Sequence, residues 1–216
     1  KNMRFRGMFL ERIRAFLLNK NFIEIETPLL TKSTPEGSRD FLVPSRLQPG
    51  KFYALPQSPQ QYKQLLMVAG FERYFQIARA LRDEDLRSNR TFEHSQVDLE
   101  MSFVSREDVT NLVEDMIIKI VEDLGYQIKE KPFPVVSYQE AMATYGDDKF
   151  DLRTEEEKAK HILAFAWVQG FPLFSPHETE KTKWTYSHNP FTGPRPEDEE
   201  KLYHKKDIGN ILSLQY

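Results

Sequence analysis

The chain has 216 residues, of which 39% are hydrophobic and 29% charged, and its formal net charge is −3. This length can bury the core of one domain, while the absence of cysteine excludes disulfides and thiolate metal sites. No stretch approaches the roughly 18 apolar residues of a membrane span, and the negative charge leaves nucleic-acid binding to local patches. Because Lys1 comes first and no signal sequence opens the chain, we expect a piece of a longer cytoplasmic protein.

The first expected element is an amphipathic helix over residues 4–19, because apolar side chains recur there at helical spacing. These positions are Phe5, Phe9, Ile13, Phe16 and Leu17. Residues 22–26 predict a short strand that ends at Pro28. Core packing explains this pair of elements, and an interface role explains it equally, since proline suits a strand end or edge.

A polar loop with a proline and a glycine follows at residues 31–40. Glu36 lies at the tip of this loop, where residues bind more often than they pack. Residues 41–44 and 52–55 then predict a hairpin.

The strongest local helix signal begins at Ser58, which we expect as the N-cap, with Pro59 in the first helical position. Gly70 is expected to end this helix, and Leu65, Leu66 and Val68 to anchor it. These last residues give the helix its apolar side.

Gln60 and Lys63 are three residues apart, so they share one face near the positive end of this helix. One interpretation is a solvated polar face. The other is an anion site, in which Lys63 and free backbone N–H groups meet a carboxylate.

Two strands, at residues 75–84 and 95–103, flank a polar loop at residues 85–93 and predict a hairpin. We expect one face of the second strand to pack on the core through Val97, Leu99, Met101 and Phe103. On the opposite face, polar side chains of the two strands would lie together. They are Arg82, Glu84, Gln96, Asp98 and Glu100. This polar face is either solvated or the floor of a binding pocket. Arg87 and Arg90 in the loop favour the pocket, because guanidinium groups recognise phosphate.

The second half of the chain predicts a helix over residues 106–124 that is capped by Ser105 and ended by Gly125. Ser137 and Glu140 form a capping box for a short helix, and Thr154 is expected to cap another. Apolar residues 162–168 and residues 184–191 predict strands. His188 follows Ser187 near the end of the second one, and a lone histidine is more often structural than catalytic.

The sequence LRDEDLRSNRTFEHSQVDLEMSF at residues 81–103 resembles motif 2 of class II aminoacyl-tRNA synthetases, specifically the bacterial-type aspartyl-tRNA synthetases. The resemblance also covers residues 5–30, which match motif 1, and further blocks in the same order. These blocks are TPEGSRDFLVPS, ALPQSPQQYKQLLMVAGFERYFQIAR, WVQGFPLF and SHNPFTGPRPED. It implies an α+β fold, with a mostly antiparallel sheet flanked by helices and incomplete at its C-terminal end, and one partial catalytic domain over residues 1–216.

The resemblance also implies an activity, in which L-aspartate is activated with ATP and Mg²⁺ and transferred to tRNA-Asp, with tRNA-Asn as an alternative acceptor. The enzyme would be an aspartate–tRNA ligase that forms a homodimer through motif 1 and has no membrane partner. The implied catalytic residues are Arg82 and Glu84. Residues around aspartate would be Glu36, Ser58, Gln60, Lys63, Arg82, Gln96, Asp98 and His188. ATP would meet Arg82, Glu84, Arg90, Thr91 and His94, and the tRNA acceptor end would meet Arg87 and Arg90.

The sequence departs from the family in several places. No segment like motif 3 precedes Tyr216, so we expect adenylation by these residues alone to be absent or impaired, and no metal ligand among them. We also expect these residues to lack the N-terminal anticodon-binding barrel. Bacterial relatives usually insert a further domain near the position of residues 153–161, and its absence here means either that this lineage lacks the insertion or that it was removed from the sequence. Thr91 replaces an amide that contacts ATP and His94 a phenylalanine that stacks on adenine, so we expect altered nucleotide binding. Asn189 replaces a second histidine.

Two alternatives to the leading hypothesis remain at this point. One is a tRNA-independent ligase that adenylates aspartate for another acceptor. The other, motivated by the missing motif 3, is a non-catalytic module for dimerisation or RNA binding.

Overall fold

The computed structural model describes residues 2–34, 37–86, 91–177, 179–180, 182–187, 192–204 and 207–214. The chain forms two compact units, Lys1–Val109 and Thr110–Tyr216. Within the described ranges, no helix combines the length and the apolar character needed to cross a membrane.

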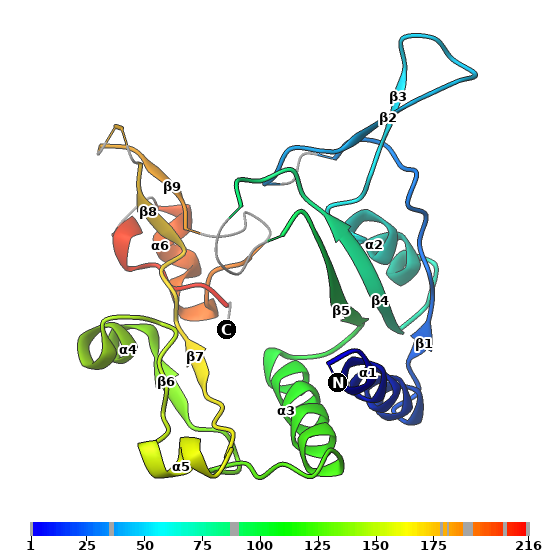
Figure 1. Cartoon of the computed structure of the whole chain (residues 1–216). Helices are drawn as coiled ribbons and strands as arrows, with labels where there is room; N and C mark the ends of the chain where they lie inside the picture. The colour runs from blue at the N-terminus through cyan, green and yellow to red at the C-terminus, as the bar shows by residue number, and fades with distance from the viewer. Residues whose placement is uncertain are drawn as a thin grey trace. The chain divides into compact units, whose positions relative to one another are not determined.

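The first unit is built on a three-stranded sheet with the order β1-β4-β5 (Figure 1). Its strands are β1 (Ile23–Glu24), β4 (Arg73–Leu81) and β5 (Glu93–Met101). β4 pairs with β1 in parallel and with β5 in antiparallel register. Strand β1 has two residues, so it is shorter than the strand predicted over residues 22–26.

Helix α1 (Asn2–Asn19) confirms the predicted first helix, and Arg14 ties it to β1 by donating to both carboxylate oxygens of Glu24 at 2.9 and 3.0 Å. Only Ile13 and Leu17 of this helix are buried. The earlier apolar positions stay at least partly exposed within this chain, Phe5 at 42%.

The hairpin of β2 (Leu42–Pro44) and β3 (Phe52–Ala54) is confirmed. Helix α2 (Gln60–Val68) follows, with Pro59 as its N-cap, so the prediction that Ser58 caps it was off by one position. The Ser58 hydroxyl nevertheless accepts a hydrogen bond from the Gln60 amide at 3.3 Å.

Gly70 closes α2 as expected, at φ +90°, in the left-handed region that favours glycine. The Gly70 and Phe71 amides donate to Met67 and Leu66, the paired bonds of a Schellman end. The expected anchors were partly wrong, because Leu65 is 63% exposed.

Strand β4 ends at Leu81, so Arg82 and Glu84 lie just beyond the strand that was predicted to include them. β5 ends at Met101, and Phe103 is 96% exposed with φ 58°, which corrects its expected place in the core. The strand stops there because the left-handed backbone of Phe103 cannot continue a β ladder.

Helix α3 (Arg106–Asp123) confirms the predicted helix over residues 106–124. Ser105 and Asp108 cap it reciprocally, since the Asp108 amide donates to the Ser105 hydroxyl while the Asp108 carboxylate accepts from the Ser105 amide. Gly125, at φ +82°, ends it.

The second unit contains short paired strands and helices (Figure 1). Its strands are β6 (Val135–Ser137), β7 (Trp167–Gln169), β8 (Phe174–Pro176) and β9 (Trp184–Tyr186). Its helices beyond α3 are α4 (Tyr138–Tyr145), α5 (Glu155–Ala159), η1 (Pro196–Asp198), α6 (Glu199–Tyr203) and η2 (Ile208–Asn210). β6 and β7 are parallel, whereas β8 and β9 are antiparallel.

The predicted capping box at Ser137 of α4 and the predicted cap at Thr154 of α5 are confirmed, and Thr154 also forms a full capping box with Glu157. The strand predicted at residues 162–168 forms only at its end, as β7. Trp167 and the Phe133 amide donate to the two carboxylate oxygens of Glu114 at 2.8 and 3.0 Å, which joins α3 to this region. Helices beside mainly antiparallel pairs confirm the α+β class.

Candidate active site

The β4–β5 hairpin presents a polar face that α2 partly covers (Figure 1). Residues directly opposite one another in a sheet share a face, and the register sets Gln76 against Asp98 and Ala78 against Gln96. Gln76 is 6% exposed and Asp98 8% exposed. The predicted polar face therefore exists, and this part of it is buried rather than solvated.

Lys63 of α2 lies between two carboxylates of this face. Its Nζ atom is 2.9 Å from Asp98 Oδ1 and 3.0 Å from Glu100 Oε2, with 13% of its side chain exposed. Burial, the largest single influence, lowers the pKa of Lys63, but the two carboxylates together outweigh it and raise the pKa above its ordinary value. Lys63 therefore stays charged, as a buried ammonium does when it is paired.

Neighbouring side chains of the polar face form further hydrogen bonds, one of which reaches Asp98 of this ion cluster. Gln96 donates to Asp98 Oδ2 at 3.0 Å, while Gln76 Oε1 accepts from the Tyr74 hydroxyl at 2.7 Å and from Thr27 at 3.0 Å. Burial, followed by the charges of Asp98 and Glu100, raises the pKa of Tyr74 and keeps its phenol neutral.

Gln57, which the sequence prediction missed, connects the loop before β2 to the chain before α2. It is 3% exposed, accepts from the Ser38 amide at 3.0 Å, and donates to the Ser38 carbonyl and to Asp40 at 2.8 and 2.6 Å. The only signal for it in the sequence is its position directly before Ser58.

Arg82 and Glu84 lie close to this Gln57 connection. The Arg82 amide donates to the Phe92 carbonyl at 2.8 Å, and its Nε makes a long contact of 3.4 Å to the Gln57 carbonyl. The Ser38 hydroxyl donates to Glu84. Ser38 thus links Glu84 to Gln57, and Gln57 contacts Arg82.

Thr91 lies at the described end of the hairpin loop, and His94 is the second residue of β5. The Thr91 hydroxyl donates to the Glu93 carbonyl at 2.6 Å. His94 lies opposite Ala80 in the register and is half-buried, on the same face as Gln96 and Asp98. An imidazole in this place can contact a ligand on the polar face.

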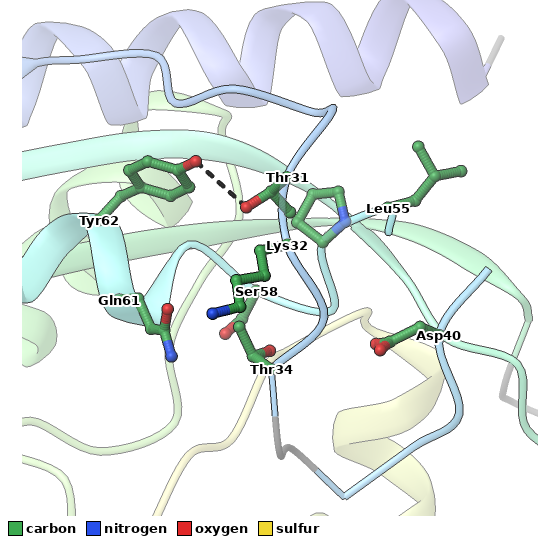
Figure 2. Close-up of a pocket in the computed structure, with 9 residues that line it drawn as sticks. Thr31, Lys32, Thr34, Asp40, Leu55, Ser58, Gln61 and Tyr62 are labelled. Atoms are coloured by element: carbon green, nitrogen blue, oxygen red, sulfur yellow. Dashed lines mark hydrogen bonds between the residues drawn. The ribbon is translucent and has the colours of Figure 1, made fainter. Parts of the chain in front are cut away.

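Ser58 lines a hollow of about 10 Å³, enough for one water molecule, beside the start of α2 (Figure 2). The hydroxyls of Thr31 and Tyr62 close one side of it at 3.1 Å, and Asp40 lies on the other side. Gln60 is half-buried at the first position of the helix.

Of the expected site residues, the structure brings Lys63, Gln96 and Asp98 together, with Glu100 as an added member. Glu36, Arg87, Arg90 and His188 lie outside the described residues. The roles expected for individual site residues stay predictions.

The arrangement is suited to binding and positioning charged groups. Lys63 carries one positive charge against two negative ones, so the cluster as a whole attracts an ammonium group. An ammonium has three N–H donors, and two carboxylates occupy two of them, which leaves one for a ligand oxygen. Within the described ranges, no three His, Cys, Asp or Glu side chains gather as a metal site.

Comparison with known proteins identifies the family. The model described as tRNA synthetases class II (D, K and N) matches residues 1–214. The chain therefore belongs to the class II tRNA synthetases of the D, K and N group, which confirms the class expected from residues 81–103. This class implies the use of ATP.

Curated relatives carry the resemblance further. The chain is 60% identical over 154 residues to an aspartate–tRNA(Asp/Asn) ligase of Rubrobacter xylanophilus, a match covering 71% of this chain and 26% of the relative. It is 58% identical over 153 residues to an aspartate–tRNA ligase of Thermosipho africanus, covering 71% and 26%. The matched part of the chain thus spans about a quarter of the length of these relatives, and the expected resemblance to aspartyl-tRNA synthetases is confirmed.

A solved structure from Leishmania major Friedlin, described provisionally as an aspartyl-tRNA synthetase, is 27% identical with a TM-score of 0.49. The match covers 56% of this chain and 23% of that one.

Proposed function

We propose that the protein containing these residues is an aspartate–tRNA ligase, which activates L-aspartate with ATP and transfers it to tRNA. The observation that carries this proposal is the buried Lys63 between Asp98 and Glu100, on a scaffold whose relatives are named aspartate–tRNA ligases. A cation held at the floor of a polar face suits the side-chain carboxylate of aspartate, and the surrounding acids suit its α-ammonium.

In the proposed reaction, a carboxylate oxygen of aspartate forms a bond to the α-phosphorus of ATP, and the bond to pyrophosphate breaks. Arg82 binds both the α-phosphate and the reacting carboxylate, which neutralises charge where it develops in the transition state. Lys63 holds the other carboxylate of the substrate. Ser58, Gln60 and Asp98 orient the α-ammonium, and Glu36, Gln96 and His188 complete the aspartate site. No covalent enzyme intermediate is needed, so positioning carries the rate.

ATP would be bound by Arg82 and Glu84, with Arg90, Thr91 and His94 along the hairpin loop and Arg87 and Arg90 toward the tRNA acceptor end. Mg²⁺ would shield the phosphate charges. The described acidic and histidine side chains form no cluster of three for a metal ion, so no step within this chain is assigned to it.

Helix α1 is the proposed homodimer interface. Met3, Phe5 and Met8 are between 42% and 81% exposed, and the rings of Phe5 and Phe9 stack at 6.4 Å. A run of exposed apolar side chains on one helix is typical of a surface that a partner covers. A second copy of the chain is the partner that the motif 1 resemblance implies.

The proposed acceptor is tRNA-Asp, and the names of the Rubrobacter and other relatives support tRNA-Asn as a second acceptor. The proposed location is the cytoplasm. Two further expectations stay predictions. One is the absence of an inserted domain near residues 153–161, and the other is the absence or impairment of adenylation by residues 1–216 alone. A tRNA-independent ligase and a non-catalytic module remain the competing functions.

Aspartate-dependent exchange of pyrophosphate into ATP by the full-length protein tests this proposal. We expect exchange with aspartate and much slower exchange with asparagine or lysine. The absence of exchange with aspartate, or a faster rate with another amino acid, would overturn the proposal. Exchange without aminoacylation of tRNA would favour the tRNA-independent ligase.

A further inference from the structure

Three segments of the first unit meet at the side chain and carbonyl of Gln57. Residues 38–40 lie before β2, residues 56–58 before α2, and residues 82–84 after β4. The last two of these segments carry residues proposed to bind aspartate and ATP. Gln57 itself is 3% exposed and is not among the proposed ligands of either substrate.

The segment at residues 82–84 extends beyond the sheet and is supported from outside it. The register between β4 and β5 ends at Leu81, so the two proposed ATP ligands that follow lie past the paired strands. The backbone there pairs with the loop before β2 instead, because the Asp83 amide donates to the Arg39 carbonyl at 3.0 Å. The position of these ATP ligands therefore depends on how firmly the loop at residues 38–40 is attached.

The Gln57 side chain attaches this loop through three hydrogen bonds. Its Oε1 atom accepts from the Ser38 amide at 3.0 Å, and its Nε2 atom donates to the Ser38 carbonyl at 2.8 Å and to Asp40 at 2.6 Å. The ion pair between Arg39 and Asp83 adds little, since its atoms are 3.7 Å apart and its side chains are 74% and 40% exposed. The buried amide is therefore the stronger attachment.

Gln57 also reaches both proposed ATP ligands of the segment after β4. Its main-chain carbonyl accepts a long hydrogen bond of 3.4 Å from Arg82 Nε. Its side chain fixes the backbone of Ser38, whose hydroxyl donates to the Glu84 carboxylate. A guanidinium and a carboxylate that are fixed before a ligand arrives lose less conformational entropy when they bind it.

We propose that Gln57 is a positioning residue for ATP binding. It holds Arg82 and Glu84 in the arrangement that receives the nucleotide, and it does not contact the substrates. The assignment of these two residues to ATP rests on the proposed ligase function. Lys63 is held by its own carboxylate partners, so recognition of the aspartate side chain should depend much less on Gln57.

Titration calorimetry of the full-length protein with ATP tests this role without requiring turnover. Gln57→Met keeps the length of the side chain and removes its three hydrogen bonds, so the Kd for ATP should rise about tenfold. Ser38→Ala removes the link to Glu84 and should raise the Kd about threefold. Because both changes act through one chain of contacts, the double variant should bind ATP about as weakly as Gln57→Met alone.

A pair of isosteric changes distinguishes the hydrogen bonds of Gln57 from its volume. Gln57→Glu places a carboxylate against Asp40 and the Ser38 carbonyl, so it should weaken ATP binding at least as much as Gln57→Met. Addition of Asp40→Asn gives that carboxylate an N–H donor and should recover about threefold of the lost affinity.

Two controls separate positioning from a general loss of stability. Gln64→Met changes an exposed glutamine of α2 and should leave the Kd for ATP unchanged. Glu114→Gln disturbs a comparable group in the second unit, where the carboxylate accepts from Trp167 and from the Phe133 amide. It should lower the midpoint of thermal unfolding and leave the Kd for ATP unchanged.

Pyrophosphate exchange supplies a second readout. A loss of folded protein lowers kcat and leaves both KM values unchanged. Displaced ATP ligands also raise the KM for ATP, which should increase about tenfold in Gln57→Met, while the KM for aspartate should change much less.

Four results would overturn the positioning role. They are an unchanged or lower Kd for ATP in folded Gln57→Met, effects of Gln57→Met and Ser38→Ala that multiply independently, no recovery by Asp40→Asn, and equal weakening by Glu114→Gln. Failure of the ligase function looks different, since the native protein would then show no aspartate-dependent exchange while its ATP affinity still depended on Gln57. A native protein that binds no ATP would overturn both.

Discussion

Lys63 Nζ lies 2.9 Å from Asp98 Oδ1, so this ion pair joins the start of α2 to the middle of β5. Both side chains are largely buried, at 13% and 8% exposure. A buried pair contributes modest net stability, but removal of one partner leaves an uncompensated charge in the interior. The loss of either Lys63 or Asp98 should therefore destabilise the polar face.

Replacement of Lys63 by methionine should lower the free energy of unfolding by about 3 kcal/mol, because it leaves Asp98 and Glu100 facing each other without a cation. Urea unfolding of the chain measures this. Gln64→Met, on the exposed side of the same helix, should have little effect. Addition of Asp98→Asn to Lys63→Met should recover part of the loss, and equal stability of Lys63→Met and the native chain would contradict this account.

The stability should also fall at alkaline pH. The pKa of Lys63 is raised in the folded state, so its contribution is complete below the unfolded value of about 10.4 and is lost as pH rises through the folded value. The raised pKa of Tyr74 acts in the same direction, since an unfolded tyrosine ionises at about pH 10.

Unfolding free energies measured across this alkaline range should show the native chain and Lys63→Met converging. Tyr74→Phe should remove the separate contribution of the phenol. A constant difference between the native chain and Lys63→Met up to the highest pH would be inconsistent with a raised pKa for Lys63.

Gln57→Ala should free the loop that contains Ser38, because it removes three hydrogen bonds from a buried amide. We expect a loss of about 2 kcal/mol from the groups left unpaired. Hydrogen exchange should show the Ser38 amide exchanging faster. Gln61→Ala, an exposed glutamine of α2, is the control, and unchanged protection of Ser38 would refute the role given to Gln57.

Asp198 should stabilise the segment at residues 207–214, the last one that the structure describes. It is 3% exposed, accepts from the Leu212 amide at 2.9 Å, and pairs with Lys201 at 2.5 Å. Burial raises the pKa of Asp198, but these partners together outweigh it and hold the pKa below its ordinary value.

Asp198→Asn should therefore cost about 1–2 kcal/mol in unfolding free energy at neutral pH. The contribution of the carboxylate is present above the unfolded pKa of about 3.9 and is lost as pH falls through the lower folded value. The difference between the variant and the native chain should thus shrink in acid. Glu199→Gln provides an exposed control, and a difference that grows in acid would contradict the lowered pKa.

Local chemistry explains which elements could be predicted from the sequence. The capping boxes at Ser137 and Thr154 and the helix ends at Gly70 and Gly125 depend on neighbouring residues alone, and the structure has all four. The polar face of β5 followed from the strict alternation of its side chains.

Contacts between distant segments explain the errors. Leu65 and Val68 were expected to anchor α2, but the face that meets the sheet carries Lys63, whose carboxylate partners come from β5. Gln57 could not be found, because its partners lie near residue 38 and no spacing within its own segment reveals them.

The most direct test of the central claim is steady-state pyrophosphate exchange by the full-length protein with Lys63→Ala. If Lys63 binds the side-chain carboxylate of aspartate, the KM for aspartate should rise about 10- to 100-fold. This is the loss expected for a hydrogen bond to a charged group. The KM for ATP should stay nearly constant in Lys63→Ala. In the control variant Gln64→Ala, the KM values for aspartate and for ATP should both stay nearly constant. Equal increases in both KM values for folded Lys63→Ala would contradict the account.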